Sequence, residues 1–329
     1  MTHSSPRRAL LATAAVLALG TLHEPAALAQ AASAYPAKAI TFVVPFAAGS
    51  ATDQLARALG QSITNDTKQP VVIDNKAGAS GMIAASAVAK SAADGYSVLI
   101  TTNTTHAANE HLYKKLSYDP VKDFAPVTGL GKGGQVLVVN ASAPYKNVGE
   151  LLAFAKKNPG KLSFGSGSSS SRMAGEMLKQ LAAVDILHVP YKSNPLAITD
   201  LLGGQIDLMI TDTSTGVPQV KAGKLRALGY STTQRSPQLP DTPTLAEVGI
   251  TNFEALAYWG VIAPAKTPSD IVNRMHAEIQ KALKEPAVAE RLGAQGMTVT
   301  GQGPADGKPA DWSPAVHRPD RISARAHWE

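Results

Sequence analysis

The sequence predicts a mixed α/β protein of two lobes, each built on a mainly parallel, doubly wound sheet. Short apolar runs alternate with segments of helical spacing from Tyr35 onward. This alternation occurs once in each half of the chain, and in both halves the loops after the apolar runs are rich in Gly, Ser and Thr. Such loops converge on one crevice of a doubly wound sheet, so two sets of them predict a cleft between the lobes.

Length and composition limit the function classes. A chain of 329 residues suffices for two domains, and an apolar fraction of 44% is typical of a globular protein. The net charge is +6, but no basic run exceeds two residues and aromatic residues make up 5%, which argues against nucleic-acid binding. The absence of Cys excludes disulfides, thiolate metal sites and Cys nucleophiles.

Residues 1–29 have the pattern of a cleavable signal peptide. Arg7 and Arg8 precede the apolar run 9–20, and 27–29 (ALA) fits a cleavage site that ends near Ala29. The arginine pair fits both an ordinary secretory signal and the twin-arginine route. We therefore expect a periplasmic mature protein, with no later segment apolar enough to cross a membrane.

The first half opens with an apolar strand at 40–44, a small-residue loop at 45–50 and a helix that begins near Thr52. This arrangement directs free backbone N–H groups at an anion. The elements that follow are a strand at 71–74, a Gly-rich turn at 75–81, an Ala-rich helix at 82–91, a strand at 96–101 and a polar cluster at 102–106.

The second half repeats this order. We expect strands at 136–140, 162–165, 186–189, 206–210 and 225–230, helices at 148–157 and 173–183, and polar loops at 166–171, 190–195 and 211–214.

Several motifs then carry a family resemblance. The first two are 45–53 (PFAAGSATD) and 75–81 (NKAGASG). Further motifs in the same order are DGY at 94–96, HVPYK at 188–192, DLLGGQID at 200–207, KAGKLRAL at 221–228 and the run from 235 to 244. Over about residues 35–301 the chain resembles the substrate-binding proteins of tripartite tricarboxylate transporters, also called Bordetella uptake gene (Bug) proteins.

The resemblance implies a two-lobe periplasmic-binding-protein (Venus-flytrap) fold, with two doubly wound sheets joined by a two-strand hinge. It implies a monomer without cofactor that binds a small carboxylate in the cleft and delivers it to integral-membrane transporter subunits. With crossings near 135–139 and 258–263, lobe one spans 35–137 plus 259–301 and lobe two spans 138–258.

The chain departs from the family pattern at several positions. Ser50 and Ser80 replace glycines, Ala77 replaces a proline, and Ser193-Asn194 replaces a Gly-rich pair. Because these changes alter the side chains beside the cleft, we expect a ligand that differs from that of common relatives. Residues 302–329 contain four prolines where relatives have a helix, so we expect a disordered tail and hypothesise a frameshift.

In lobe one, backbone N–H groups and hydroxyls supply the donors that a carboxylate needs. We expect the ligand to contact Phe46, Gly49, Ser50, Thr52, Ala79, Ser80, Thr104, Thr105 and His106. His106 either pairs with an anion or is a hydrogen-bonded loop histidine. Asp53 fits a residue of the first helical turn better than a ligand contact.

In lobe two, Ser166, Ser168 and Ser169 are expected at the distal carboxylate, where the alternative is a flexible serine loop with a helix cap. Ser193 and Asn194 lie where this lobe closes over the ligand. Asp212 either accepts a hydrogen bond from a ligand hydroxyl or ammonium group or caps the next helix.

Other functions fit the sequence poorly. The motif GLGKGG at 129–134 matches G-x-G-x-x-G, but a strand follows it and not a helix. There is no G-x-S-x-G, P-loop or H-E-x-x-H, so we expect no enzyme, no metal and no cofactor. The alternatives that stay open are a receptor for a sensor system and, more remotely, a secreted hydrolase that uses Ser166–Ser171.

Overall fold

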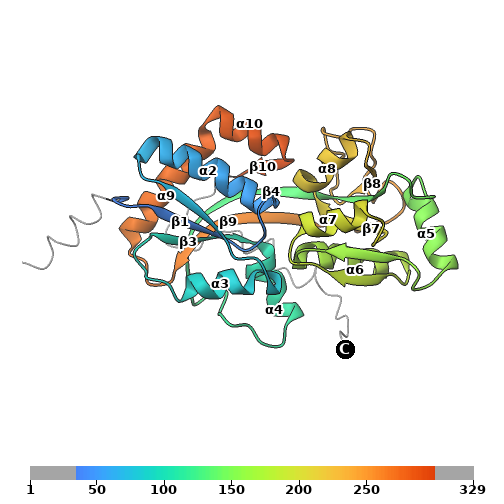
Figure 1. Ribbon diagram of the computed structural model, residues 1–329, viewed down its shortest axis with the longest axis horizontal. Helices are drawn as coiled ribbons and strands as arrows, with labels where there is room; N and C mark the ends of the chain where they lie inside the picture. Colours follow the sequence, from blue (N-terminus) through green and yellow to red (C-terminus); the bar gives the residue numbers. More distant parts are fainter. Residues whose placement is uncertain (1–34, 301–329) are drawn as a thin grey trace, which may run out of the picture.

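The computed structural model describes residues 35–300, and the expected signal peptide and C-terminal tail lie outside this range. The fold is mixed α/β, with two α/β halves side by side along the longest axis (Figure 1). Strands β4 (Phe124–Asn140) and β9 (Leu256–Pro264) run along the middle of the molecule. Within residues 35–300 no helix has the length and apolar character that a bilayer span requires.

The first half contains the sheet β2-β1-β3-β9-β4, in which β1 is parallel to β2 and β3 while β9 is antiparallel to its two neighbours. Its remaining strands are β1 (Ile40–Val44), β2 (Val71–Asn75), β3 (Ser97–Thr102) and β10 (Met297–Val299). Its helices are α2 (Ala51–Thr67), α3 (Met82–Ala89), α4 (Asn109–Leu112), α9 (Ser269–Lys284) and α10 (Pro286–Ala294).

The second half continues the sheet in the order β4-β7-β5-β6, with β8 paired to β4. Its strands are β5 (Ser163–Ser166), β6 (Leu187–Pro190), β7 (Leu208–Asp212) and β8 (Leu225–Tyr230). Its helices are α5 (Val148–Lys157), α6 (Ser169–Ala182), α7 (Asn194–Leu202) and α8 (Thr213–Lys221).

Strand β4 belongs to both halves because it changes partners along its length. Residues 124–134 pair with β9, whereas residues 135–140 pair with β7 and β8. The glycine motif 129–134 therefore lies inside a strand, which corrects the expectation that a strand follows it. Gly131 allows β10 to approach, because an added Cβ would lie 2.6 Å from the carbonyl oxygen of Thr298. The residue limits of the two lobes stay a prediction.

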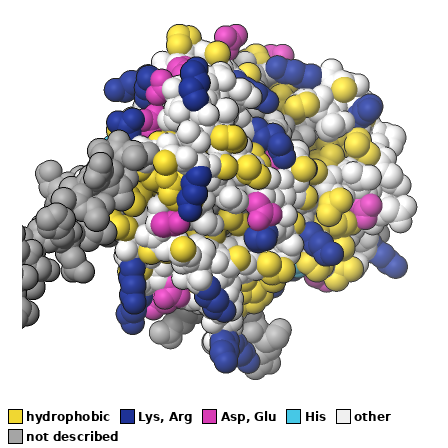
Figure 2. All heavy atoms as spheres, turned by 60° about the vertical axis from the view of Figure 1, so that its left-hand side comes forward, with side chains coloured by type: hydrophobic (Ala, Val, Ile, Leu, Met, Phe, Trp, Pro, Cys, Tyr) yellow, Lys and Arg dark blue, Asp and Glu magenta, His cyan; other side chains and the backbone are white. Residues whose placement is uncertain are grey.

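Each half has its own hydrophobic core. In the first half, Leu55 and Leu59 of α2 and Ile279 of α9 pack against the sheet and are fully buried. In the second half, Phe164 of β5 and Leu178 of α6 are buried in a separate cluster. Burying one apolar face of each helix is what stabilises such layers. On the face in Figure 2, Lys and Arg side chains are interspersed with acidic and hydrophobic ones and form no single basic patch.

The structure corrects one helix prediction and two loop predictions in the second half. Helix α6 begins at Ser169 and not at Met173, because Ser168 and Ser171 form a reciprocal capping box. Helices α7 and α8 begin at Asn194 and Thr213, inside the segments 190–195 and 211–214 that the sequence predicts as polar loops. The segment of α8 is rich in Thr and contains Pro218, so its local helix propensity is poor and packing against the sheet decides its conformation.

Candidate functional site

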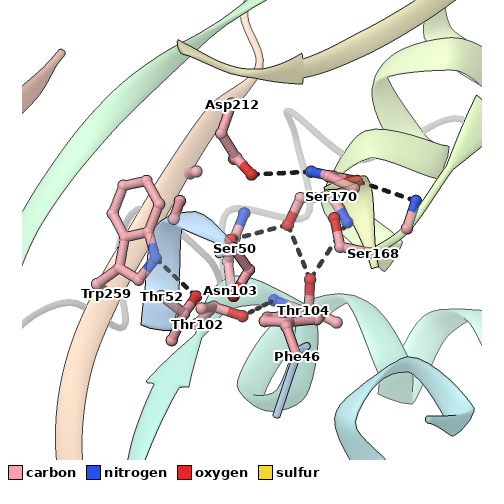
Figure 3. A pocket seen from close by; sticks show the side chains of 14 residues that line it. Phe46, Ser50, Thr52, Thr102, Asn103, Thr104, Ser168, Ser170, Asp212 and Trp259 are labelled. Carbon is pink, nitrogen blue, oxygen red and sulfur yellow. Dashed lines mark hydrogen bonds between the residues drawn. The ribbon is translucent and has the colours of Figure 1, made fainter. Parts of the chain in front are cut away.

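A pocket lies between the two halves and is lined by residues of both (Figure 3). Its empty space, with the open solvent at its mouth included, is about 330 Å³. The lining residues are Phe46, Ser50, Ala51, Thr52, Thr102, Asn103, Thr104, Gly167, Ser168, Ser170, Asn194, Asp212, Ala257 and Trp259.

Four helices begin at this pocket. Lining residues occupy the cap or the first turn of α2, α6, α7 and α8, and each of these helices is at least nine residues long. The N-terminal end of a helix carries a partial positive charge from aligned peptide dipoles. Within residues 35–300 no Lys, Arg or His lines the pocket, so the described lining offers an anion these helix ends and no cationic side chain.

The first turn of α2 presents backbone donors to the pocket. The Ser50 hydroxyl caps the helix by accepting a hydrogen bond from Asp53 N at 3.2 Å. Within residues 35–300, the N–H groups of Ala51 and Thr52 have no acceptor, and both residues line the pocket. Two open amides on adjacent residues can bind an oxyanion without reorganising the backbone.

Asp53 stabilises the loop before α2 through hydrogen bonds on the side away from the pocket. Its carboxylate accepts hydrogen bonds from Gly49 N (2.9 Å), Asn75 Nδ2 (3.0 Å) and Arg57 Nε (3.0 Å). Burial alone would raise the pKa of Asp53, but these hydrogen bonds lower it below its usual value. Asp53 is thus a residue of the first helical turn and does not line the pocket, as the sequence favoured.

Trp259 of β9 forms one wall of the pocket, which sequence reasoning missed. Its indole Nε1 donates to Thr52 Oγ1 at 3.0 Å and so joins β9 to the start of α2 (Figure 3). Both side chains are buried. The only sequence signal for this role was an aromatic residue within an expected crossing between lobes.

The halves contact each other directly beside the pocket. Ser170 Oγ of α6 donates to Asn103 Oδ1 at 2.9 Å and lies 3.0 Å from Thr104 Oγ1 (Figure 3). Ser169 Oγ donates to Asn109 Oδ1 at 2.8 Å. These hydrogen bonds hold α6 against the polar segment after β3.

His106 lies outside the pocket lining. It belongs to a π-helical turn, Thr104–Ala108, and its Nδ1 is 2.6 Å from Thr101 Oγ1. Its ring packs edge-on against Phe124, with 4.7 Å between the ring centroids. Burial lowers the pKa of His106 to about 3, so the ring is neutral at physiological pH.

Asn194 links three parts of the second half. Its Oδ1 accepts hydrogen bonds from Gly167 N at 2.9 Å and from Ser171 Oγ at 3.2 Å. Its Nδ2 donates to Asp212 Oδ2 at 2.8 Å. Asp212 occupies the N-cap position of α8, but its side chain makes no capping hydrogen bond.

The structure gathers about half of the predicted site residues at the pocket. Those that line it are Phe46, Ser50, Thr52, Thr104, Ser168, Asn194 and Asp212. Those that lie outside the lining are Gly49, Ala79, Ser80, Thr105, His106, Ser166, Ser169 and Ser193. Several of the latter bond to protein groups, as Ser166 does to His188 Nε2 (2.7 Å) and Ser80 to Tyr113 (2.8 Å). Ligand contact by any of these residues stays a prediction.

Comparison with known proteins gives consistent matches. Residues 55–306 match the family model described as tripartite tricarboxylate transporter family receptor. Protein BugT of Bordetella pertussis is 35% identical over 81% of this chain and 83% of its own length.

Two solved structures are also similar. A structure of an R. palustris protein with adipate is 35% identical, covers 83% of this chain and 92% of its own, and has a TM-score of 0.80. MatC from Rhodopseudomonas palustris with bound malate is 32% identical, covers 86% and 94%, and has a TM-score of 0.78.

Proposed function

Because the chain belongs to the tripartite tricarboxylate transporter receptor family, which includes the Bug proteins, we propose that it captures one small organic carboxylate and delivers it to a tripartite membrane transporter. Members of this family are periplasmic solute receptors and not enzymes. Adipate and malate in two similar structures support the ligand class.

The convergence of four helix N-termini on one pocket carries this proposal. Each helix end is worth about 0.3–1 kcal/mol to an anion, and more where the site is partly buried. The open amides of Ala51 and Thr52 add two donors for one carboxylate, and surrounding hydroxyls add adaptable donors. A carboxylate therefore binds there without a cationic side chain.

The connection between the halves supports capture by closure. Strands β4 and β9 run between the halves, and direct hydrogen bonds such as Ser170–Asn103 join the halves beside the pocket. Opening about these strands would admit the ligand, and closure would bury it and present one surface to the transporter.

A thermal-shift screen against mono-, di- and tricarboxylates of three to eight carbons tests the ligand class. A ligand at a hundred times its Kd stabilises the folded protein by about 2.7 kcal/mol. For a chain of this size, that stabilisation raises the melting temperature by roughly 5–10 °C. If no carboxylate raises the melting temperature, the proposed ligand class is wrong.

Two variants at one position locate the binding. Ser50→Trp removes the cap of α2 and fills the pocket, so we expect no ligand-induced shift. Ser50→Ala removes the hydroxyl and its capping hydrogen bond, which costs about 1 kcal/mol, but leaves the pocket unfilled and should keep a ligand-induced shift. Equal ligand-induced shifts in both variants would place the binding elsewhere.

A further inference from the structure

Among the described residues that line the pocket, Asp212 is the only one with an ionisable side chain. It ends β7, is partly buried, and receives a hydrogen bond on Oδ2 from Asn194. It does not cap α8, although it holds the N-cap position. A carboxylate that neither caps a helix nor forms an ion pair, and that faces a pocket, is available to a ligand.

A second polar side chain, Gln135, lies beside Asp212. Gln135 of β4 lies directly opposite Asp212 in the antiparallel β4–β7 ladder, so their side chains project from the same face of the sheet. Gln135 is fully buried, and neither Oε1 nor Nε2 has a hydrogen-bond partner within residues 35–300. Because buried polar groups in folded proteins are nearly always hydrogen-bonded, this amide favours a polar group over an apolar one next to Asp212.

The charge of Asp212 restricts what the ligand places beside it. A second carboxylate there would meet a like charge in a poorly solvated site that has no cationic side chain to offset it. A hydroxyl or ammonium group there would instead donate a charge-assisted hydrogen bond, which is the stronger kind. The open amides of α2 are left for the ligand's own carboxylate.

We infer that the pocket selects carboxylates that bear a hydrogen-bond donor, a hydroxyl or an ammonium group, and that Asp212 accepts that donor. This inference rests on the proposed carboxylate receptor and adds the substituent that its ligand carries. Burial raises the pKa of Asp212, while the Asn194 hydrogen bond lowers it. Burial therefore destabilises the charged carboxylate, and a hydrogen bond from the ligand's donor would stabilise it. An ammonium and a hydroxyl are distinguished by the test below.

Calorimetry with matched ligands tests the selection. The panel holds succinate, malate and aspartate at four carbons, and adipate, 2-hydroxyadipate and 2-aminoadipate at six. We expect a donor-bearing acid to bind the wild-type protein at least tenfold more tightly than the plain acid of equal length, or about 1.4 kcal/mol. Equal affinities would overturn the inference.

Asp212→Asn removes the charge, keeps the shape of the side chain and removes no capping hydrogen bond of α8, so we expect the fold to be preserved. In this variant the affinities of the donor-bearing acid and of the plain acid of equal length should differ by no more than about threefold. We expect the plain acid to bind more tightly and the substituted acid more weakly than they bind the wild-type protein. An ammonium donor loses more affinity than a hydroxyl in this variant, because only the ammonium loses an opposite charge. Asp185→Asn makes the same change at an exposed position of the same half and should leave the ratio unchanged.

Other outcomes contradict the inference in distinct ways. If Asp212 is protonated and holds a plain dicarboxylate, succinate or adipate binds as tightly as its substituted analogue and more weakly at pH 8 than at pH 6. If the ratio is unchanged in Asp212→Asn, another residue selects the ligand. If plain and substituted acids all fail to bind, the proposed receptor function itself is wrong.

Discussion

The hydrogen bond between Ser169 and Asn109 offers a test of closure that leaves the pocket lining intact. Ser169 Oγ on α6 donates to Asn109 Oδ1 on α4 at 2.8 Å, and the two residues are 1% and 0% exposed. Neither residue lines the pocket. Ser169→Ala should therefore weaken ligand binding only through the equilibrium between open and closed forms.

The size of the effect follows from burial. In the closed form, Ser169→Ala leaves Asn109 Oδ1 without this donor, and a buried unsatisfied acceptor costs about 1–3 kcal/mol. In an open form water can reach the same oxygen, so the cost falls on the closed form alone. At about 1.4 kcal/mol per factor of ten, the closed form loses a factor of roughly 5–150. Kd rises by that factor if the free protein is mostly open.

The assay combines calorimetry with small-angle X-ray scattering. We expect a higher Kd for the best carboxylate of the screen, a faster dissociation rate, and a larger radius of gyration in any population that was closed without ligand. Ser163→Ala is the matched control, because it removes a hydrogen bond to Asp207 (3.0 Å) within one half. If Ser169→Ala changes neither Kd by more than twofold nor the radius of gyration, this contact does not hold the closed form.

Two further substitutions test the site and its surroundings. Gly167→Ala would place Cβ 1.9 Å from the carbonyl carbon of Ser193, so the start of α7 must move. Calorimetry should then show at least a tenfold loss of ligand affinity. Unchanged affinity would contradict this packing. His106 has a pKa of about 3 in the folded protein, below its unfolded value, so the unfolded state gains a proton first as pH falls. In urea unfolding, the free energy of unfolding of the wild-type protein should fall by about 1.5 kcal/mol between pH 6.5 and 5 because of this residue. The free energy of unfolding of His106→Asn should lack this part of the pH dependence.

Local residue patterns were sufficient for most of the elements. The apolar run 40–44, the cap residue Ser50 and the period of α2 act over a few residues, and the structure has that strand and helix almost where they were predicted. The helix 148–157 and the strand 225–230 have the predicted bounds. Helix α8 was missed because its stability comes from packing, and packing has no local signature.

The residue types of the site were also readable from the sequence, because loops rich in Ser, Thr and Gly supply the backbone and hydroxyl donors for a carboxylate. Only the tertiary structure decided which donors face the pocket. Ser166 and Ser169 sit in a promising run, yet their hydroxyls bond to His188 and Asn109, the latter 60 positions away. Trp259 reaches Thr52 across 207 positions. Hydrogen bonds form wherever folding brings two groups within about 3 Å, so a side chain's availability to a ligand depends on distant neighbours that no local pattern specifies.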